Sequence, residues 1–405
     1  MIVERTLAGR IRQVSRAFPA VLVSGPRGAG KTALLKACAG AGCDCVSLDD
    51  PENRRLANEN PLLFLRRHRP PVFIDEVQHA APRLFPYIKA AVDEARRPGM
   101  FWLASSLLYQ FMPLTESLCG RVALLRLQGL SRSEQDGLPD CGPFMPDGVE
   151  DRAASASPAD ETALFERVWH GSYPARLGAG DADWLVWHQW LVQSLVGHDV
   201  RDFWPDADPA GFVAFIKAAA ERTGQALDMA DLARASGISV SRAEAWLNML
   251  KALCLVEVVS PLHAGDARHV HAPRLYFLDT GLACSLAGIT SPEALRQGPM
   301  RQAMLETWVV SELLKSWWHS GKEPPLYSHY DASGRAVPLV LTLNGLVHPI
   351  WISQKERPAA EDMGSIDVTR GYLPGAPRGR GVVLCMAREP YQVTEDVVGV
   401  PLGWV

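Results

Sequence analysis

The chain has 405 residues, of which 47% are hydrophobic, and its 45 acidic residues nearly balance its 41 basic residues. That length supports two or three domains with cores of their own. The formal net charge of −4 excludes an overall positive charge that would attract nucleic acid, so any contact with DNA has to use a local basic patch.

The most informative segment lies near the N-terminus, where an apolar run leads through a glycine-rich turn into a helix. Residues 20–24 predict a buried strand. The glycines that follow allow a tight turn with several backbone N–H groups pointing inward, which makes an anion site. Lys31 can reach the β- and γ-phosphates of a nucleotide, and the Thr32 hydroxyl can bind Mg²⁺. The predicted loop for ATP consists of Gly25, Pro26, Arg27, Gly28, Ala29, Gly30, Lys31, Thr32 and Ala33.

Residues 70–78 form a second motif, a short apolar run that ends in Asp75 and Glu76. Because the run is apolar on both faces, it fits a central strand of a parallel sheet covered by helices. Ligands of such sheets collect at the carboxyl ends of strands, so Asp75 is predicted to lie beside the loop and bind Mg²⁺ directly or through water. Glu76 is predicted to be the general base that positions the attacking water. The pair of acids favours hydrolysis over binding alone.

Two later segments offer further groups for this chemistry. A strand over residues 99–104 leads to Ser106, which either contacts the γ-phosphate or the attacking water, or caps the next helix. Arg121 precedes an apolar strand over residues 122–127. It either stabilises the γ-phosphate charge, in its own subunit or in a neighbour, or forms a structural salt bridge. The sequence leaves these alternatives open.

These motifs resemble those of a family of prokaryotic AAA-type ATPases, AAA family 14. In that family the ATPase is joined to a C-terminal domain of unknown function of the DUF 4143 type. The similarity covers nearly the whole chain, through residues 25–32, 47–52, 73–78, 116–121, 171–175, 198–201, 275–283 and 306–314. The resemblance implies ATP binding, an AAA-type core, a winged-helix segment and a nuclease-like C-terminal fold.

The chain departs from the family pattern in two places. Ala104-Ser105-Ser106 stands where the family has Thr-Gly-Ser, so only the last hydroxyl is kept. Nuclease-like relatives also hold Mg²⁺ with acidic residues and a lysine on two strands. The corresponding positions here carry residues that bind hard cations poorly, namely Ala336, Pro338, Trp351 and Ser353. With Glu306 as the remaining acid, we expect an inactive nuclease fold that serves as a scaffold or binding surface.

Residues 227–277 show the pattern of a winged helix, with two short helices followed by two strands around a turn. A DNA reader would place the second helix in the major groove with basic or amide side chains outward. Residues 221–279 nevertheless contain six basic and seven acidic side chains, so DNA contact and a protein-packing role both stay open. Contact with duplex DNA would use Arg242, Asn248, Arg268 and Arg274.

The predicted fold class is α/β, and the chain is expected to contain four domains. These are a P-loop AAA-type ATPase domain with a parallel sheet, a helical lid, a winged helix and a C-terminal α/β nuclease-like domain. The expected boundaries are 1–135 for the ATPase domain, 136–160 for a flexible linker or insertion, 161–222 for the lid, 223–290 for the winged helix and 291–405 for the nuclease-like domain.

The expected location is the cytoplasm. The N-terminus lacks the apolar segment of a secretory signal, no apolar run reaches membrane-spanning length, and the eight cysteines lack the spacing of zinc or disulfide sites. The predicted function is Mg²⁺-dependent ATP hydrolysis coupled to remodelling or binding of DNA or a protein partner. The alternative is a slow nucleotide switch or scaffold that assembles with a protein partner, of the toxin–antitoxin or defence type. Homo-oligomerisation is compatible with both.

Overall fold

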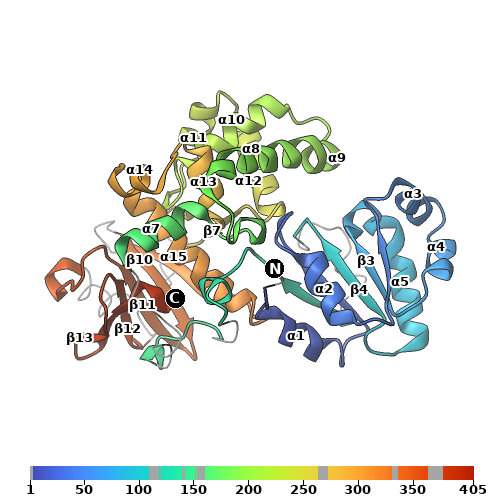
Figure 1. Cartoon of the computed structure of the whole chain (residues 1–405), viewed down its shortest axis with the longest axis horizontal. Helices are drawn as coiled ribbons and strands as arrows, with labels where there is room; N and C mark the ends of the chain where they lie inside the picture. Colours follow the sequence, from blue (N-terminus) through green and yellow to red (C-terminus); the bar gives the residue numbers. More distant parts are fainter. Residues whose placement is uncertain are drawn as a thin grey trace.

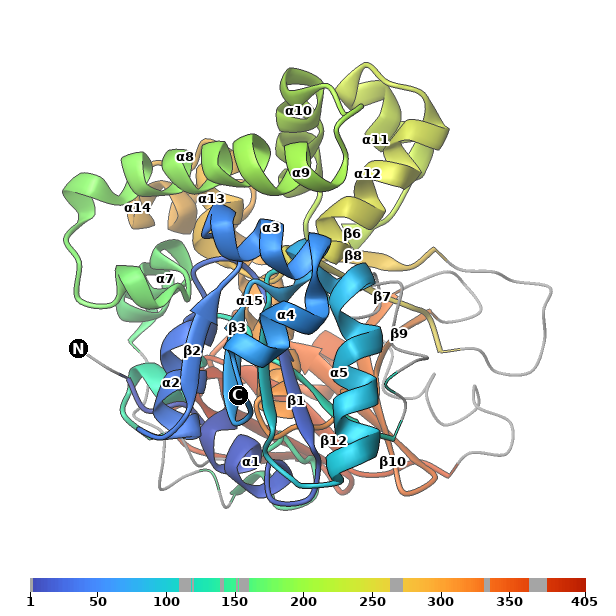
Figure 2. The same cartoon turned by 90° about the vertical axis from the view of Figure 1, so that its right-hand side faces the viewer.

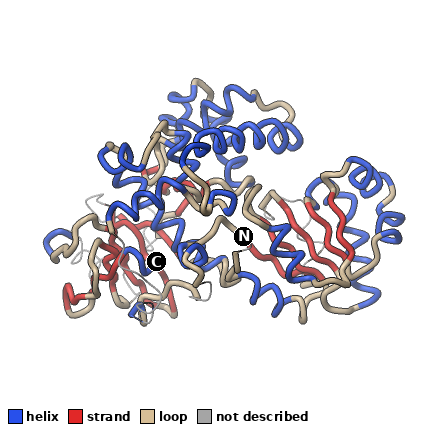
Figure 3. Tube along the Cα trace, in the orientation of Figure 1, coloured by secondary structure: helices blue, strands red, loops and turns tan. Residues whose placement is uncertain are grey.

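The computed structural model describes residues 3–108, 118, 120–138, 142–150, 152, 160–262, 272–330, 336–363 and 377–405. Two large sheets lie at opposite ends of the molecule, and most of the helices of the central segments lie between and above them (Figures 1 and 3). Within the described ranges, every helix is too short or too polar to cross a membrane.

The N-terminal part is a parallel five-stranded sheet of order β2-β3-β4-β1-β5. Its strands are β1 (Ala20–Ser24), β2 (Asp44–Ser47), β3 (Val72–Asp75), β4 (Phe101–Ser105) and β5 (Val122–Arg126). Its helices are α1 (Leu7–Val14), α2 (Lys31–Ala39), α3 (Pro51–Glu59), α4 (Pro61–Arg67) and α5 (Ala81–Ala95). Helices α1 and α2 form a hydrophobic core on one face of the sheet, and α3, α4 and α5 form a second core on the other. Strands β1, β3 and β4 are buried throughout, as expected for strands covered on both faces.

The central part is mainly helical. After the short helix α6 (Arg132–Gln135) come α7 (Glu161–His170), α8 (Trp184–Ser194), the π-helix η6 (Leu195–Val200), α9 (Arg201–Phe203) and α10 (Pro209–Ala220). In Figure 2, α8 and α9 lie along one nearly continuous helix, and η6 joins them. Helices α11 (Met229–Ser236) and α12 (Val240–Ala252) then lie, along the chain, between the first and second strands of an antiparallel sheet of order β6-β8-β7. Its strands are β6 (Gln225–Ala226), β7 (Val256–Val259) and β8 (Arg274–Phe277).

The C-terminal part is built on a mixed six-stranded sheet of order β13-β14-β12-β11-β10-β9. Helices α13 (Thr280–Leu286), α14 (Pro292–Gln297) and α15 (Arg301–Trp318) lead into it. Its strands are β9 (Leu326–Tyr330), β10 (Ala336–Leu343), β11 (Leu346–Ile352), β12 (Gly381–Cys385), β13 (Tyr391–Thr394) and β14 (Val397–Pro401). Most residues of α15 are buried, including the charged side chains of Glu312 and Lys315.

One hydrophobic core joins the parts that the sequence divides into lid, winged helix and nuclease-like domain. It also includes Phe144 and Val149, both fully buried, from the segment that was expected to be a flexible linker. Around Phe144 and Val149 that segment is therefore packed, because these two side chains lie in the core. The central and C-terminal parts consequently depend on each other for burial.

Candidate functional site

The glycine-rich loop connects the carboxyl end of β1 to the first turn of α2. Gly28 and Gly30 have φ values of 84° and 92°, in the left-handed region that favours glycine. Gly25 has a different constraint, since a Cβ atom there would lie 1.8 Å from the carbonyl oxygen of Leu127. The loop can therefore follow this path only with glycine at these positions.

Lys31 lies across the loop and is buried. Its Nζ donates to the carbonyl oxygens of Gly25 at 2.9 Å and Pro26 at 3.0 Å, and to Ser106 Oγ at 3.1 Å. Burial lowers the pKa of Lys31 because water is removed from the ammonium group, and the nearby Glu76 carboxylate opposes that effect. The ammonium group is thus held at the mouth of the loop by three acceptors.

Asp75 ends β3 beside the start of α2, as the sequence predicts. Its Oδ2 accepts a hydrogen bond from Thr32 Oγ1 at 2.7 Å, and its Oδ1 accepts one from the backbone N–H of Glu76 at 3.1 Å. Burial raises the pKa of Asp75, and the Thr32 hydroxyl partly offsets this. The two residues predicted to hold Mg²⁺ are therefore in direct contact.

Glu76 follows Asp75 in a left-handed backbone conformation, with φ 51° and ψ 45°, which is uncommon for a residue with a side chain. Its Oε1 accepts a hydrogen bond from Ser106 Oγ at 2.8 Å, and its Oε2 accepts one from Gln78 Nε2. Burial alone would raise the pKa of Glu76, but Lys31 and these hydrogen bonds lower it below its ordinary value. The carboxylate is therefore ionised and fixed at both oxygens.

Ser106 connects the two halves of the site, since it accepts from Lys31 and donates to Glu76. This contact matches the alternative in which Ser106 acts near the reacting groups. The helix that it was otherwise expected to cap falls outside the described residues. Gln78 was part of the motif seen in the sequence but was given no role, and its contact with Glu76 became visible only in three dimensions.

Arg121 lies away from this site. It directly precedes β5, whose first residue pairs with Ala20 at the start of β1, whereas the loop follows the other end of β1. Five residues of strand separate the two ends by about 16 Å. Arg121 instead pairs with Asp93 on α5, with Nη2 and Oδ2 3.2 Å apart. The predicted action on the γ-phosphate of its own subunit is therefore wrong, and the salt bridge predicted as an alternative is present.

The central helices contact the loop through an ion pair that the sequence did not indicate. Arg27 Nε and Nη2 donate to the two carboxylate oxygens of Asp199 in the π-helix, at 3.1 and 3.2 Å. The Asp199 side chain is only 1% exposed. This bidentate contact fixes the loop to η6.

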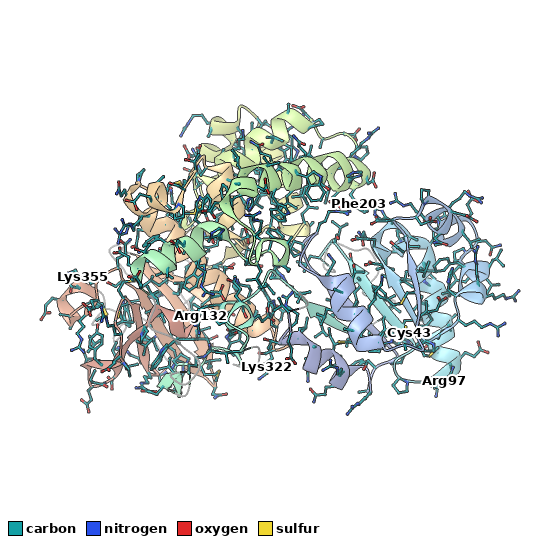
Figure 4. The ribbon with its side chains drawn as sticks, in the orientation of Figure 1. Cys43, Arg97, Arg132, Phe203, Lys322 and Lys355 are labelled. Atoms are coloured by element: carbon teal, nitrogen blue, oxygen red, sulfur yellow. The ribbon has the colours of Figure 1, made fainter. Side chains whose placement is uncertain are left out.

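A second contact joins the same helical segment to the turn after Glu76. The ring of Phe203, labelled in Figure 4, stacks on His79 with centroids 5.4 Å apart. His79 closes the short 3₁₀ turn η1 (Val77–His79) that follows Glu76. Both nucleotide motifs are therefore in contact with residues 199–203.

The residues predicted to contact DNA differ in their exposure and in their partners. Arg242 and Asn248 are exposed on α12, and Arg268 lies outside the described residues. Arg274 pairs with the buried Glu306 at 2.8 Å. The prediction that Arg274 contacts DNA is therefore wrong, because the buried carboxylate of Glu306 holds its guanidinium inside the protein.

The residues discussed for a nuclease site also have structural partners. Glu306 accepts a hydrogen bond from Tyr276 at 2.6 Å as well as the ion pair from Arg274, and the Trp351 side chain is buried in a small core beside β11. Among the described residues, no group of three or more His, Cys, Asp or Glu side chains is placed to hold a metal ion. The inactive nuclease fold stays a prediction.

Comparisons with family models divide the chain in two. Residues 17–135 match a model described as an AAA domain, and residues 161–293 match a domain of unknown function, DUF8612. The resemblance in the sequence implied the DUF 4143 type instead. The second match runs across residues 222–223, where the lid was expected to give way to the winged helix.

Two relatives of similar sequence come from mycobacteria. They are the uncharacterized proteins Rv2008c of Mycobacterium tuberculosis and Mb2031c of Mycobacterium bovis. Each is 28% identical over 350 residues, which cover 83% of this chain and 73% of the relative.

Similar solved structures are more distant. The Walker-type ATPase PABY2304 of Pyrococcus abyssi is 13% identical, and the match covers 70% of this chain and 96% of that one with a TM-score of 0.43. A DNA replication initiation factor is 12% identical, with coverage of 61% and 90% and a TM-score of 0.26. Structural matches with TM-scores this low do not support an assignment, which therefore rests on the family model and on the geometry of the site. Residues 17–135 are therefore an AAA domain of the P-loop type, joined to a segment that matches a domain of unknown function.

Proposed function

We propose that this protein binds ATP with Mg²⁺ at the loop of residues 25–33 and hydrolyses its β–γ bond. The observation that carries the proposal is a connected set of side chains. Thr32 bonds to Asp75, and Lys31 is linked through Ser106 to Glu76. A phosphate-binding lysine, a pair of hard oxygen ligands and an ionised carboxylate are the parts that phosphoryl transfer to water requires.

The phosphates would be held by the backbone amides of the loop and by Lys31. Helix α2 begins at Lys31, so the positive end of its dipole faces the loop. An ammonium group has three donors, and those of Lys31 already contact two loop carbonyls and Ser106. The hydroxyl of Ser106 is carried on a side chain that can rotate, whereas the other two acceptors belong to the backbone. A γ-phosphate oxygen would take its place on Lys31.

Thr32 and Asp75 fit a magnesium ion. Both present hard oxygen atoms, and those atoms lie 2.7 Å apart. Adjacent ligands of an octahedral Mg²⁺ at 2.0–2.1 Å are separated by about 2.9 Å, so a small opening of this contact admits the ion. When bound, Mg²⁺ would neutralise charge on the β- and γ-phosphates.

Glu76 would act as the general base. Because its pKa lies below the ordinary value, it is ionised at neutral pH and accepts a proton from water. The water oxygen bonds to the γ-phosphorus, the bond to the bridging oxygen breaks, and ADP leaves. Ser106 keeps Glu76 oriented through its hydrogen bond to Oε1.

Steady-state release of phosphate from ATP tests the proposal. Glu76→Gln keeps the shape of the side chain but removes the base, so we expect turnover to fall about 10²–10⁴-fold with ATP affinity within about threefold of wild type. Lys31→Ala should abolish nucleotide binding. Lys89→Ala, at a half-exposed position on α5, is the matched control and should behave like wild type. A wild-type protein without turnover would refute hydrolysis, and normal turnover in Glu76→Gln would refute the base assignment.

Hydrolysis would be coupled to DNA or to a protein partner through the central helices. The contacts of Arg27 with Asp199 and of His79 with Phe203 support coupling, because they link both nucleotide motifs to one helical segment. The order α11, α12, β7, β8 supports a winged helix, in which α12 presents Arg242 and Asn248.

Duplex DNA at moderate salt separates the two kinds of coupling. Stimulated turnover that is lost in Arg242→Ala would favour a DNA remodeller. Slow turnover that is indifferent to DNA, together with ATP-dependent assembly, would favour a switch that acts with a protein partner or as a homo-oligomer.

A further inference from the structure

Gln78 is a buried glutamine that contacts the proposed base. Its side chain is in the interior, and its Nε2 donates to Glu76 Oε2. Because a carboxylate is only an acceptor, it selects the NH₂ end of the amide, and the carbonyl end must point elsewhere. The orientation of the carboxamide is thereby fixed.

The carbonyl oxygen of Gln78 has no hydrogen-bond partner among the described residues and is inaccessible to solvent. Leaving a buried acceptor unpaired is costly, because the oxygen has lost its hydrogen bonds to water and gained none in return. Both atoms of the amide belong to one rigid planar group, so the unpaired oxygen is fixed next to the Glu76 carboxylate. An unpaired acceptor beside the proposed base is a position where a ligand of the site can bind.

We propose that Gln78 is a second water-positioning residue. The attacking water would donate one hydrogen bond to Glu76 Oε2 and the other to Gln78 Oε1, which requires the Gln78 side chain to turn enough to admit the water, because its carbonyl oxygen is closed to solvent in this structure. With both of its hydrogens engaged, a lone pair of the water oxygen is free to face the γ-phosphorus. The balance is that of simple hydrolysis: an O–P bond forms, the bond to the bridging oxygen breaks, and the proton passes to Glu76. The inference rests on the proposed ATP hydrolysis.

The backbone around Gln78 is rigid enough for such a role. Val77 and Ala80, on either side of it along the chain, are fully buried in the core beneath α3, α4 and α5. Glu76 is held in its left-handed conformation between β3 and η1. Positions fixed in this way can keep two acceptors at a constant separation, as the orientation of one water requires.

The alternative is a structural role, in which Gln78 only fixes the Glu76 side chain. A water-positioning role lowers the energy of the transition state and leaves ATP binding unchanged. A structural role affects every state of the site. The two therefore differ in how they affect turnover and the binding of two phosphate analogues.

The test uses the full-length protein with Gln78→Met, which keeps the length of the side chain and removes both polar atoms. Gln128→Met is the matched control, because Gln128 is also buried and its Nε2 is unpaired among the described residues. The readouts are turnover, ATP affinity, and affinity for ADP with beryllium fluoride or aluminium fluoride. The beryllium complex resembles bound ATP, and the aluminium complex resembles the transition state with its water.

We expect Gln78→Met to lower turnover about 10²-fold. Its affinity for ATP and its affinity for ADP with beryllium fluoride should both stay within about threefold of wild type. The aluminium fluoride complex should weaken by a factor close to the loss in turnover. Gln128→Met should match wild type in all assays. Gln78→Asn, which keeps both polar atoms on a shorter chain, should recover part of the lost turnover and serves as the second variant if Gln78→Met does not fold.

Normal turnover in Gln78→Met would overturn the inference, and so would equal weakening of both fluoride complexes. Faster turnover would also overturn it, because Gln78 would then restrain Glu76 instead of assisting it. These results are distinguishable from failure of the proposed function, which appears as absent turnover in the wild type or as normal turnover in Glu76→Gln.

Discussion

Replacing Glu134 by glutamine tests how the AAA domain is attached to the rest of the chain. Glu134 belongs to a capping box that begins α6, in which Ser131 Oγ accepts from the Glu134 N–H and Glu134 accepts from the Ser131 N–H. The same carboxylate accepts hydrogen bonds from Arg5 Nε at 3.0 Å and from the Thr6 N–H at 2.8 Å. His319, at the end of α15, lies 3.3 Å away. One buried carboxylate thus joins the N-terminal segment, α6 and α15.

The magnitude follows from the burial of the pair. The Arg5 and Glu134 side chains are 6% and 0% exposed. Removing one partner of a buried pair costs about 3–5 kcal/mol, because the other charge stays buried. Arg5 keeps carbonyl partners at Ala29, Gln128 and Gly129, so we take the lower end, about 3 kcal/mol. At about 2.1 cal/mol/K per residue, unfolding of the 405-residue chain changes the entropy by roughly 0.85 kcal/mol/K, so Glu134→Gln should lower the melting temperature by about 3–4 °C.

Thermal unfolding without nucleotide measures this effect. The matched control is Glu59→Gln, which removes an exposed pair with Arg55 and should change the melting temperature by less than about 2 °C. Burial would raise the pKa of Glu134, but His319 and Arg5 lower it well below its ordinary value of 4.5. The stabilisation is therefore complete above about pH 4.5 and is lost as the pH falls further. A difference from wild type no larger than that of Glu59→Gln, or one that widens toward low pH, would refute the reasoning.

Three further outcomes are expected. Asp199→Asn removes the charge that binds the P-loop arginine, so hydrogen exchange in η6 and α9 should accelerate while the rest of the AAA domain is unchanged. Arg121→Ala should leave ATP turnover unchanged and change the melting temperature little, because water screens its exposed pair with Asp93; lost turnover would instead indicate action in a neighbouring subunit. Burial raises the pKa of Cys254 to about 11, so iodoacetamide at pH 8 should modify the exposed Cys45 and spare Cys254, as mass spectrometry of the native protein can show.

The sequence was most informative where function depends on short stretches of chain. The bounds of β1 and the loop could be predicted because glycine spacing and an apolar run specify a strand, a turn and a helix within about a dozen residues. The proximity of Asp75 to Thr32 was also predictable, because parallel strands bring their carboxyl ends to the same edge of the sheet. These are consequences of local pattern and sheet topology.

Contacts between distant side chains were not predictable in the same way. Asp199 meets Arg27 across 172 residues, and Arg274 meets Glu306 in the interior, yet nothing in the local spacing of either arginine reveals a buried partner. Phe144 stands in a segment rich in glycine, proline and aspartate, so composition predicted a linker. The Phe144 side chain is nevertheless buried in the main core, because an aromatic ring gains more from burial than the surrounding polar composition suggests.

The placement of Arg27 gives the central helices a direct connection with nucleotide. Nε and Nη2 of its guanidinium bind Asp199, so the remaining N–H donors can contact a phosphate while that ion pair persists, and only a phosphate that takes the whole guanidinium would break the pair. Asp199 would then be a buried carboxylate without its charge partner, which costs several kcal/mol unless η6 moves toward water. If the pair persists when ATP binds, the loop and η6 stay fixed to each other, and any movement of the loop carries the helix with it. In both cases we expect residues 199–203 to respond to the nucleotide, and the stacking of Phe203 on His79 would extend that response to the turn that carries Glu76 and Gln78.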